Sequence, residues 1–225
     1  MSGLEIELAG ERVHLLPERA LYWEREDTLI AADLHWGKAA AFRAGGIPVP
    51  RGTTTADLAR LDRALAGTGA RRLVLLGDLL HAREWRGAET VRTIVAWRAA
   101  APGLELLLIR GNHDRRAGDP PADLGIEVVD GPYRAGPFAL RHEPRRVEGA
   151  YVLAGHIHPG VTLRGPGRER LRLPCFALGR SVGILPAFGE FTGTALTDPG
   201  PGGRVYVIAG DDVVQVDPQR IDRYG

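Results

Sequence analysis

The stretch Leu73-Val-Leu-Leu-Gly-Asp-Leu-Leu-His81 begins as a short apolar run and ends in side chains that can bind a metal ion. The runs Leu29–Ala32 and Leu104–Ile109 are built in a similar way, and each is followed closely by Asp, Asn or His. Short, mainly apolar runs are typical of strands that are covered on both faces of a sheet. The sequence therefore predicts three buried strands with polar residues at their carboxyl ends.

Helical patterns lie between these runs. Asp57–Leu65 carries leucines at helical spacing, with Thr53–Thr55 offering an N-cap and Gly67 or Gly69 an end. Ala88–Ala101 repeats this scheme between the second and third runs. Alternation of strands and helices predicts a parallel sheet with helices packed on it.

The texture of the sequence changes after residue 130, where short apolar segments alternate with Gly and Pro turns. The segments are Phe138–Arg141, Tyr151–Ala154, Cys175–Leu178, Ser181–Leu185, Arg204–Ile208 and Asp212–Val216. Short strands of this kind predict a second sheet, mixed or antiparallel. We expect surface loops at Leu163–Gly167 and Asp198–Gly203, where Gly and Pro are densest.

The composition indicates one globular domain, residues 1–225. The chain has 225 residues, of which 44% are hydrophobic, so it can bury a substantial core. Its formal charge is only +1, but Lys38 is the single lysine and arginine supplies the other basic side chains. A GC-rich genome would enrich arginine in this way, yet the guanidinium group is also the better fork for a phosphate.

Cysteine usage and hydropathy limit the cellular compartment. Cys175 is alone, so no intramolecular disulfide can form and a secreted disulfide scaffold is excluded. Residues 1–8 lack the basic and apolar regions of a signal peptide, and no run approaches the ~18 apolar residues of a membrane span. We expect a soluble cytoplasmic protein with no membrane association.

Four short islands hold five of the seven histidines. They are Asp33-Leu-His35, Gly77-Asp-Leu-Leu-His81, Gly111-Asn-His-Asp114 and Gly155-His-Ile-His158. Buried Asp and His are unfavourable unless they are paired or bound to metal, and the carboxyl ends of strands in an open α/β sheet converge on one crevice. A hydrolytic metal centre therefore explains the islands better than a purely structural role.

The order of the islands resembles that of the calcineurin-like metallophosphoesterases, over Thr28–Pro159. Two further stretches, Asp33–Pro50 and Leu185–Gly193, are similar to the bacterial ligase-associated DNA damage response endonucleases. The resemblance implies an α/β fold in which a two-sheet sandwich is flanked by helices. It also implies two divalent metal ions, with Mn²⁺ as the family expectation.

The resemblance implies three ligands for each ion and one shared ligand. They are Asp33, His35 and His158 for one ion, Asn112, His142 and His156 for the other, and Asp78 as the bridge. His142 has little local support beyond its position after an apolar run. Imidazole, carboxylate and amide donors without thiolate favour Mn, Fe or Zn and do not separate the three. Two such ions would hold a bridging water, activate it as a hydroxide for in-line attack, and clamp the phosphate oxygens.

Three further residues are expected to take part in the chemistry. His113 is beside a ligand, and the resemblance implies that it protonates the leaving-group oxygen as a general acid. Asp114 would then orient the His113 imidazole. His81 departs from the Gly-Asp-x-x-Asp-Arg-Gly form of many phosphatases in this superfamily, and it could contact the scissile phosphate or support the ligands.

Basic residues near the islands are candidates for substrate binding. Lys38 and Arg43 follow the first island closely enough to line a groove, as do Trp36 and Phe42, for which core packing is the alternative. More arginines flank the other islands: Arg83, Arg86, Arg115, Arg116, Arg145 and Arg146. Singly each would be a solvated charge, but their clustering around one crevice favours a polyanionic substrate. We expect His14 to be structural.

The function hypothesis is a binuclear, Mn-dependent phosphodiesterase that cleaves DNA. The resemblance implies an endonuclease for single-stranded or flapped DNA that acts in repair with a DNA ligase and a helicase. The alternative is a phosphoesterase for small molecules, cyclic nucleotides or phosphomonoesters, which would use the same ligands. A third hypothesis, a scaffold without chemistry, is disfavoured because such chains usually lose ligands and all the ligand positions are filled here.

Overall fold

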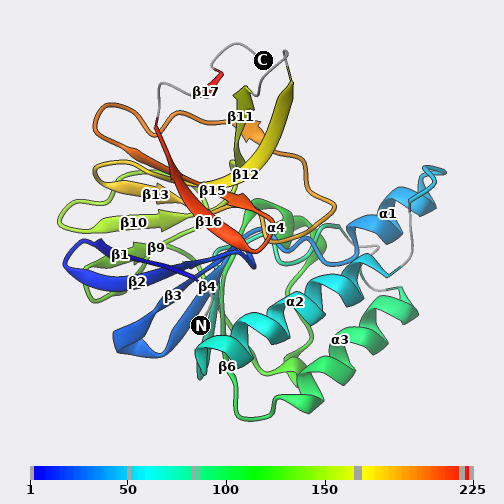
Figure 1. Ribbon diagram of the computed structural model, residues 1–225. Coiled ribbons are helices and arrows are strands. Elements are labelled where there is room, and N and C mark those ends of the chain that lie inside the picture. Colours follow the sequence, from blue (N-terminus) through cyan, green and yellow to red (C-terminus); the bar gives the residue numbers. More distant parts are fainter. Residues whose placement is uncertain are drawn as a thin grey trace.

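The computed structural model describes residues 3–49, 52–82, 85, 87–164, 169–217 and 221–222. Figure 1 shows two sheets packed face to face, with the helices α2 and α3 against the outer face of one of them. The prediction of an α/β, two-sheet sandwich flanked by helices is confirmed.

The first sheet has seven strands in the described part of the chain, in the order β1 to β7. Their bounds are β1 Leu4–Leu8, β2 Glu11–Leu16, β3 Ala20–Trp23, β4 Thr28–Ala31, β5 Arg72–Leu75, β6 Glu105–Ile109 and β7 Ile126–Val129. The strands β4 to β7 are parallel, as predicted for the three buried runs. The antiparallel strands β1 to β3 were not predicted, and they extend the sheet beyond β4.

The second sheet is mixed, as predicted, and has ten strands among the described residues. Their bounds are β8 Tyr133–Ala135, β9 Phe138–Leu140, β10 Tyr151–Ala154, β11 Pro159–Arg164, β12 Arg170–Leu178, β13 Val182–Ile184, β14 Ala195–Leu196, β15 Arg204–Ala209, β16 Asp212–Val216 and β17 Ile221–Asp222. The central strand β10 is parallel to β9 and to β13. A loop was predicted at Leu163–Gly167, but its first two residues belong to β11, which continues to Arg164. Residues 165–167 lie outside the described part of the chain.

Four α-helices and two 3-10 turns are described. They are α1 Lys38–Ala44, α2 Thr53–Thr68, α3 Ala88–Ala100, α4 Asn112–Ala117, η1 Glu24–Glu26 and η3 Ala122–Leu124. The expected threonine N-cap of α2 is wrong: Gly52, at φ 85°, precedes the helix and no side chain caps it. The end at Gly69 is confirmed, since this residue takes the left-handed conformation at φ 71°.

Successive residues of a strand point to opposite sides of the sheet, and in the central strands both sides are covered. Leu73 and Leu75 of β5 pack with α2 and α3, whereas Val74 and Leu76 pack with Phe138 and other residues of the second sheet. This explains why the central strands are almost continuously apolar. In the described part of the chain, no helix has the length and apolar character needed to cross a membrane.

Candidate metal centre

The two sheets bring the predicted ligands to one edge of the sandwich. Asp33 and His35 follow β4, Asp78 follows β5, and Asn112 opens α4 just after β6. The second sheet contributes the remaining histidines, which follow β9 and β10: His142, His156 and His158. The ends of five strands therefore converge, as expected where carboxyl ends share an edge.

Possible ligand atoms form three groups, two of which share His35, and within each group the atoms lie at most 4.8 Å apart. The groups are Asp33, His35 and His158; Asp78, His142 and His156; and His35, His81 and His113. Asn112 joins the second group, since its Oδ1 lies 2.9 Å from Nε2 of His142. The structure thus brings together the two sets that the sequence predicted.

The first group contains an unsatisfied carboxylate oxygen. Asp33 is fully buried, and its Oδ2 accepts the N–H of His156 at 2.8 Å. Its Oδ1 has no hydrogen-bond partner among the described residues, although Nε2 of His158 lies 3.5 Å away. A buried, unpaired carboxylate oxygen is unfavourable unless a cation binds it. The residues of this group therefore fit a divalent ion.

The second group is oriented by a backbone contact. Nδ1 of His142 lies 2.9 Å from the carbonyl oxygen of Leu76, so this nitrogen carries a proton and donates it. Nε2 is then turned toward Asn112 and His156, whose Nδ1 lies 3.0 Å away. A ring nitrogen anchored to a carbonyl is the usual support of a metal-binding histidine.

Asp78 lies between the two groups. Its Oδ1 is 3.4 Å from Nε2 of His142, while its Oδ2 is 4.0 Å from Nε2 of His35 and of His113. Each oxygen thus faces a different group, which is the arrangement that a bridging carboxylate needs. Burial opposes ionisation of Asp78, but its attraction to His142 lowers the pKa of the carboxyl and raises that of the imidazole.

His35 is held in the protonation state of a metal ligand. Burial lowers the pKa of His35 to about 2, against the weaker opposing attraction of Asp78. The ring is therefore neutral near pH 7, and one of its nitrogens offers a lone pair. Its Nε2 lies 3.4 Å from Nε2 of His158, a contact between two nitrogens that a shared cation would satisfy.

The backbone of the ligand segments is strained. Among the described residues, eight that are not glycine have positive φ. Five of the eight are predicted ligands: Asp33, His35, Asp78, His156 and His158. Left-handed backbone at such residues is unfavourable and clusters at functional sites. Here the chain turns sharply after each strand, which points these side chains into the centre.

The glycine that opens each of three islands leaves room for a ligand from another segment. A Cβ on Gly77 would lie 2.5 Å from Nδ1 of His142, and one on Gly155 would lie 2.5 Å from Oδ2 of Asp33. A Cβ on Gly111 would overlap Oδ1 of Asp78. The islands therefore need glycine for close packing of the ligand loops, which is a function that the sequence analysis did not assign.

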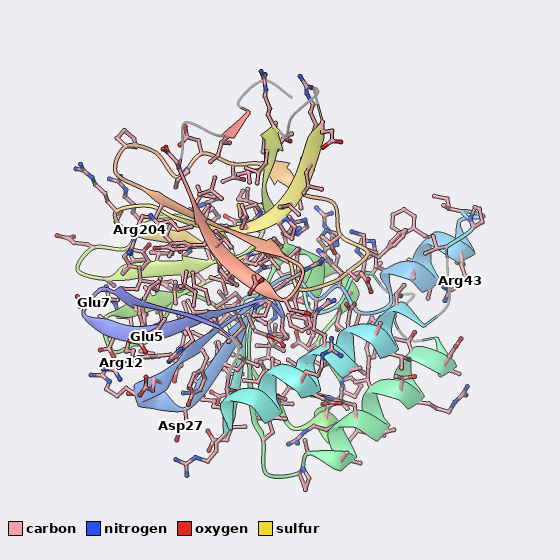
Figure 2. The ribbon with its side chains drawn as sticks, in the orientation of Figure 1. Glu5, Glu7, Arg12, Asp27, Arg43 and Arg204 are labelled. Atoms are coloured by element: carbon pink, nitrogen blue, oxygen red, sulfur yellow. The ribbon has the colours of Figure 1, made fainter. Side chains whose placement is uncertain are left out.

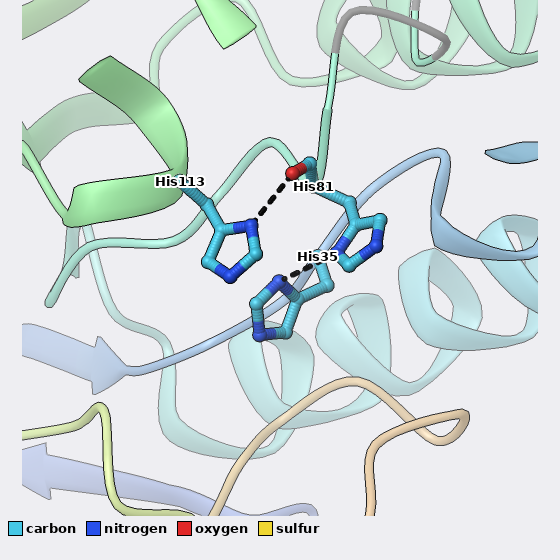
Figure 3. Close-up of side chains that lie close together, drawn as sticks. All are labelled: His35, His81 and His113. Atoms are coloured by element: carbon cyan, nitrogen blue, oxygen red, sulfur yellow. Dashed lines mark hydrogen bonds between the residues drawn. The ribbon is translucent and has the colours of Figure 1, made fainter. Parts of the chain in front are cut away.

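His113 faces Asp78 from the open side of the centre. Its Nδ1 lies 2.7 Å from the carbonyl oxygen of His81, to which it donates a hydrogen bond (Figure 3). Its Nε2 is therefore the free ring nitrogen, and the side chain is 31% exposed, so a substrate can reach it. This placement suits the predicted general acid.

The prediction that Asp114 orients the His113 imidazole is wrong. Asp114 is fully buried, and its two oxygens accept the N–H groups of Leu80 and Gly111, each at 2.9 Å. The carbonyl of His81, and not Asp114, orients the His113 ring. Asp114 faces inward from the first turn of α4, so it fixes the loop that carries Asp78.

His81 contacts its neighbours in the centre both through its backbone and through its ring. Its backbone carbonyl accepts the hydrogen bond that orients His113, and both roles considered for its side chain stay predictions. Its ring stacks on His113 with centroids 5.0 Å apart, and its Nδ1 lies 3.4 Å from Nδ1 of His35 (Figure 3). Phe42 lies on the other side, with its ring nearly parallel to His81 at 6.1 Å. Trp36 packs in the core, which was the alternative for this residue.

The candidate substrate residues on α1 point in different directions. Lys38 is half-buried at the start of the helix; burial lowers its pKa, against the opposing attraction of Asp33 and Asp78. Arg43 lies at the other end of α1, at the edge of the molecule (Figure 2). It lines a small cavity with Thr53–Thr55 at the start of α2, so its predicted place in the metal crevice is wrong.

Two of the arginines near the other islands are paired with carboxylates. Arg115 lines a cavity of about 170 Å³ beside Asn112, but its Nη2 lies 2.7 Å from Oδ1 of Asp130. Arg145 is likewise paired, with Glu143 at 2.7 Å. Arg116 and Arg146 are exposed. Arg83 and Arg86 lie outside the described residues. His14 is structural, as expected, and contacts Glu24 at 3.3 Å.

A loop of the second sheet pairs with the backbone at Asp33. The N–H groups of Phe188 and Gly189 donate to the carbonyl oxygens of Ala32 and Asp33, at 2.8 and 3.1 Å. This loop belongs to the stretch Leu185–Gly193 that carried the narrower resemblance. It therefore fixes one predicted ligand from the opposite sheet.

Buried Asp57 and partly buried Arg60, both on α2, hold the same loop. Asp57 accepts the N–H of Glu190 at 3.0 Å and pairs with Arg60 at 2.6 Å, and Arg60 donates to the carbonyl of Phe188. These residues were not predicted from the sequence. Opposite charges three residues apart, on the side of α2 that carries buried Leu58, were the signal that could have revealed them.

Comparison with solved structures identifies a similar protein. The crystal structure of Pseudomonas putida nuclease MPE matches with a TM-score of 0.85 and 46% identity, covering 95% of this chain and 100% of that chain. YfcE, a phosphoesterase from E. coli, matches with a TM-score of 0.39 and 15% identity, covering 87% of this chain and 99% of that chain, a likeness too weak to support an argument. No protein-family model and no curated protein matched. The resemblance inferred from the order of the islands is confirmed: the chain belongs to the metallophosphoesterase family and is a metal-dependent hydrolase of ester bonds.

Proposed function

We propose that the protein is a Mn²⁺-dependent endonuclease that hydrolyses phosphodiester bonds in single-stranded or flapped DNA. The observation that carries the proposal is the placement of Asp78 between two ligand groups, with the partly exposed His113 beside it. The identity of 46% to a nuclease over nearly the whole chain supports a nucleic acid as the substrate.

Seven residues would hold the two ions. They are Asp33, His35 and His158 in one group, Asn112, His142 and His156 in the other, and Asp78 between them. When bound, divalent ions in such a site supply a water of lowered pKa and neutralise charge on the phosphate. The absence of thiolate and the mixture of oxygen and imidazole donors suit Mn²⁺.

His113 would deliver a proton to the leaving oxygen. The hydrogen bond from its Nδ1 to the His81 carbonyl keeps the ring from turning, so a proton on Nε2 stays directed at the centre. This nitrogen lies 4.0 Å from Oδ2 of Asp78, so a proton carried there would face the predicted bridging ligand. A general acid of this kind typically contributes about 10²- to 10⁴-fold in rate.

The proposed cellular setting follows from the family resemblance. We propose that the enzyme acts in the cytoplasm, in a DNA repair pathway that also uses a DNA ligase and a helicase. Its formal charge of +1 means that DNA would be held by local contacts near the centre and not by the overall charge.

The test is a side-by-side assay of purified protein with Mn²⁺. The substrates are single-stranded DNA, flapped DNA, duplex DNA, a phosphomonoester and a cyclic nucleotide. We expect single-stranded and flapped DNA to be cleaved, and Asp78→Asn and a chelator each to abolish cleavage, because Asp78 would contact both ions. Faster turnover of the monoester or the cyclic nucleotide than of DNA would contradict the proposal and favour the small-molecule phosphoesterase.

A further inference from the structure

A row of aromatic rings leads from the metal centre to the surface. The ring of His113 stacks on His81 at 5.0 Å, His81 is nearly parallel to Phe42 at 6.1 Å, and Phe42 meets Phe191 edge to face at 5.7 Å. We call these four residues the aromatic row. They come from α4, the loop after β5, α1 and the loop between β13 and β14, so the fold assembles the row from four separate segments.

The outer end of the row is open to solvent. The Phe191 residue is 40% exposed, and it is the only aromatic among the large exposed hydrophobic residues of the described chain. A single exposed apolar residue is ordinary in a soluble protein. Phe191 differs because its ring contacts half-buried Phe42 edge to face, and Phe42 leads through His81 to a predicted catalytic residue.

The position of Phe191 is fixed relative to the centre. The preceding residue, Glu190, donates its N–H to buried Asp57 at 3.0 Å, and Gly189 donates to the carbonyl of Asp33 at 3.1 Å. Phe42 is fixed independently, since α1 starts only a few residues after the predicted ligand His35. These backbone hydrogen bonds place Phe191 beside the centre before a ligand arrives, which lowers the cost of ordering the surface on binding.

We infer that Phe191, backed by Phe42, stacks a nucleobase of the strand whose phosphate lies at the metal centre. This inference rests on the proposed nuclease function and specifies how its substrate is held. Every base has a flat π face, so stacking on an aromatic side chain tolerates any sequence. A paired base inside a duplex already has both faces covered, whereas an unpaired base is free to stack. The aromatic row would therefore favour single-stranded over duplex DNA.

The first measurement compares Phe191 variants on a single-stranded oligonucleotide with Mn²⁺. We expect Phe191→Ala to raise KM by roughly 5- to 150-fold, the range of one stacked base, with little change in kcat. Phe191→Leu keeps apolar volume and should also raise KM, whereas Phe191→Trp should preserve it. Val95→Ala is the matched control, because it removes another exposed apolar side chain, 41% exposed on α3.

A second measurement identifies the stacked base. Oligonucleotides with one abasic site, moved position by position, should show one position at which the wild-type KM rises and the KM of Phe191→Ala does not rise further. A wild type that cleaves no DNA would overturn the proposed function itself. If the wild type cleaves DNA but Phe191→Leu, with wild-type thermal stability, keeps the wild-type KM, the stacking inference is wrong and the nuclease function is unaffected. Additive effects at every abasic position would also overturn it.

Discussion

Nδ1 of His113 lies 2.7 Å from the carbonyl oxygen of His81, so the proton on this nitrogen is committed to the backbone. Only Nε2 can then exchange a proton with a substrate. The side chain is also 31% exposed, in contrast to the 3% of His35. This placement suits the general-acid role that we propose for His113.

We predict that His113→Ala slows DNA cleavage by about 10²- to 10⁴-fold and slows cleavage of bis(4-nitrophenyl) phosphate much less. A DNA alkoxide must be protonated as it leaves, whereas a nitrophenolate needs little help. The measurement is kcat on both substrates, together with metal content, which should not change. His14→Ala is the control, because it removes a structural histidine that lies on β2. Equal losses on the two substrates would show that His113 acts as a ligand or positioning residue.

Gly111→Ala tests whether the metal centre depends on close packing of its loops. A Cβ at this position would overlap Oδ1 of Asp78, yet the backbone at φ −88° is open to alanine, so the effect is purely steric. We expect Mn²⁺ affinity to fall by about 10- to 100-fold, the range seen when the support of a ligand is lost. Titration calorimetry measures it directly.

Gly67→Ala is the control for Gly111→Ala. Gly67 lies inside α2 with nothing within 4 Å of an added Cβ, so this change should stabilise the protein by about 0.4–1 kcal/mol. Metal affinity should stay at the wild-type value. If Gly111→Ala also binds Mn²⁺ like the wild type, Asp78 is not held as tightly as the structure indicates.

The central strands could be predicted from sequence because both of their faces are buried. An apolar run as short as Leu73–Leu76, ended by Gly77, suits a strand that is covered on both faces. The strands β1 to β3 were missed, although Leu4–Leu8 alternates apolar and acidic residues. Short strands of this kind pair through contacts that only the assembled sheet supplies.

The ligands could be predicted because the carboxyl ends of strands converge through the backbone topology, independently of the surrounding side chains. The errors concern direction: Asp114 turns inward toward Leu80, and Arg43 turns toward α2. Spacing along a sequence predicts the position of a residue, but it does not predict which neighbour the side chain contacts. For the same reason the pairing of Arg115 with Asp130, between α4 and the residue after β7, was not foreseeable.

The buried pair on α2 predicts an unusual pH dependence of stability. Burial outweighs the attraction of Arg60 and raises the pKa of Asp57 from 3.8 to about 6. The folded state then holds a proton that the unfolded state has lost between these two values. The contribution of Asp57 to stability is therefore full below about pH 4 and is lost as the pH rises through about 6.

We expect the unfolding free energy of the wild type, relative to Asp57→Asn, to fall by about 2–3 kcal/mol between pH 4 and pH 7. Denaturant unfolding of both proteins in the presence of a chelator measures this difference, and other titrating groups cancel in the comparison. A difference that grows with pH would mean that the attraction of Arg60 exceeds the effect of burial.

Two neighbouring arginines on α4 allow a matched test of DNA binding. Arg115 is paired with Asp130 at 2.7 Å, whereas Arg116 is exposed and forms no ion pair with any residue that the structure describes. Arg116 also lies one turn from the predicted ligand Asn112. A phosphate near the centre would therefore meet Arg116 without first displacing a carboxylate.

We predict that Arg116→Gln flattens the salt dependence of single-stranded DNA binding by about 0.7 in the slope of log K against log salt, the value for one phosphate contact. Arg115→Gln removes the same charge and should flatten the slope less, because Asp130 already neutralises that arginine. The measurement is equilibrium binding of a labelled oligonucleotide at several salt concentrations. If Arg115→Gln has the larger effect, the pair with Asp130 opens when DNA binds, and Arg115 is the phosphate contact.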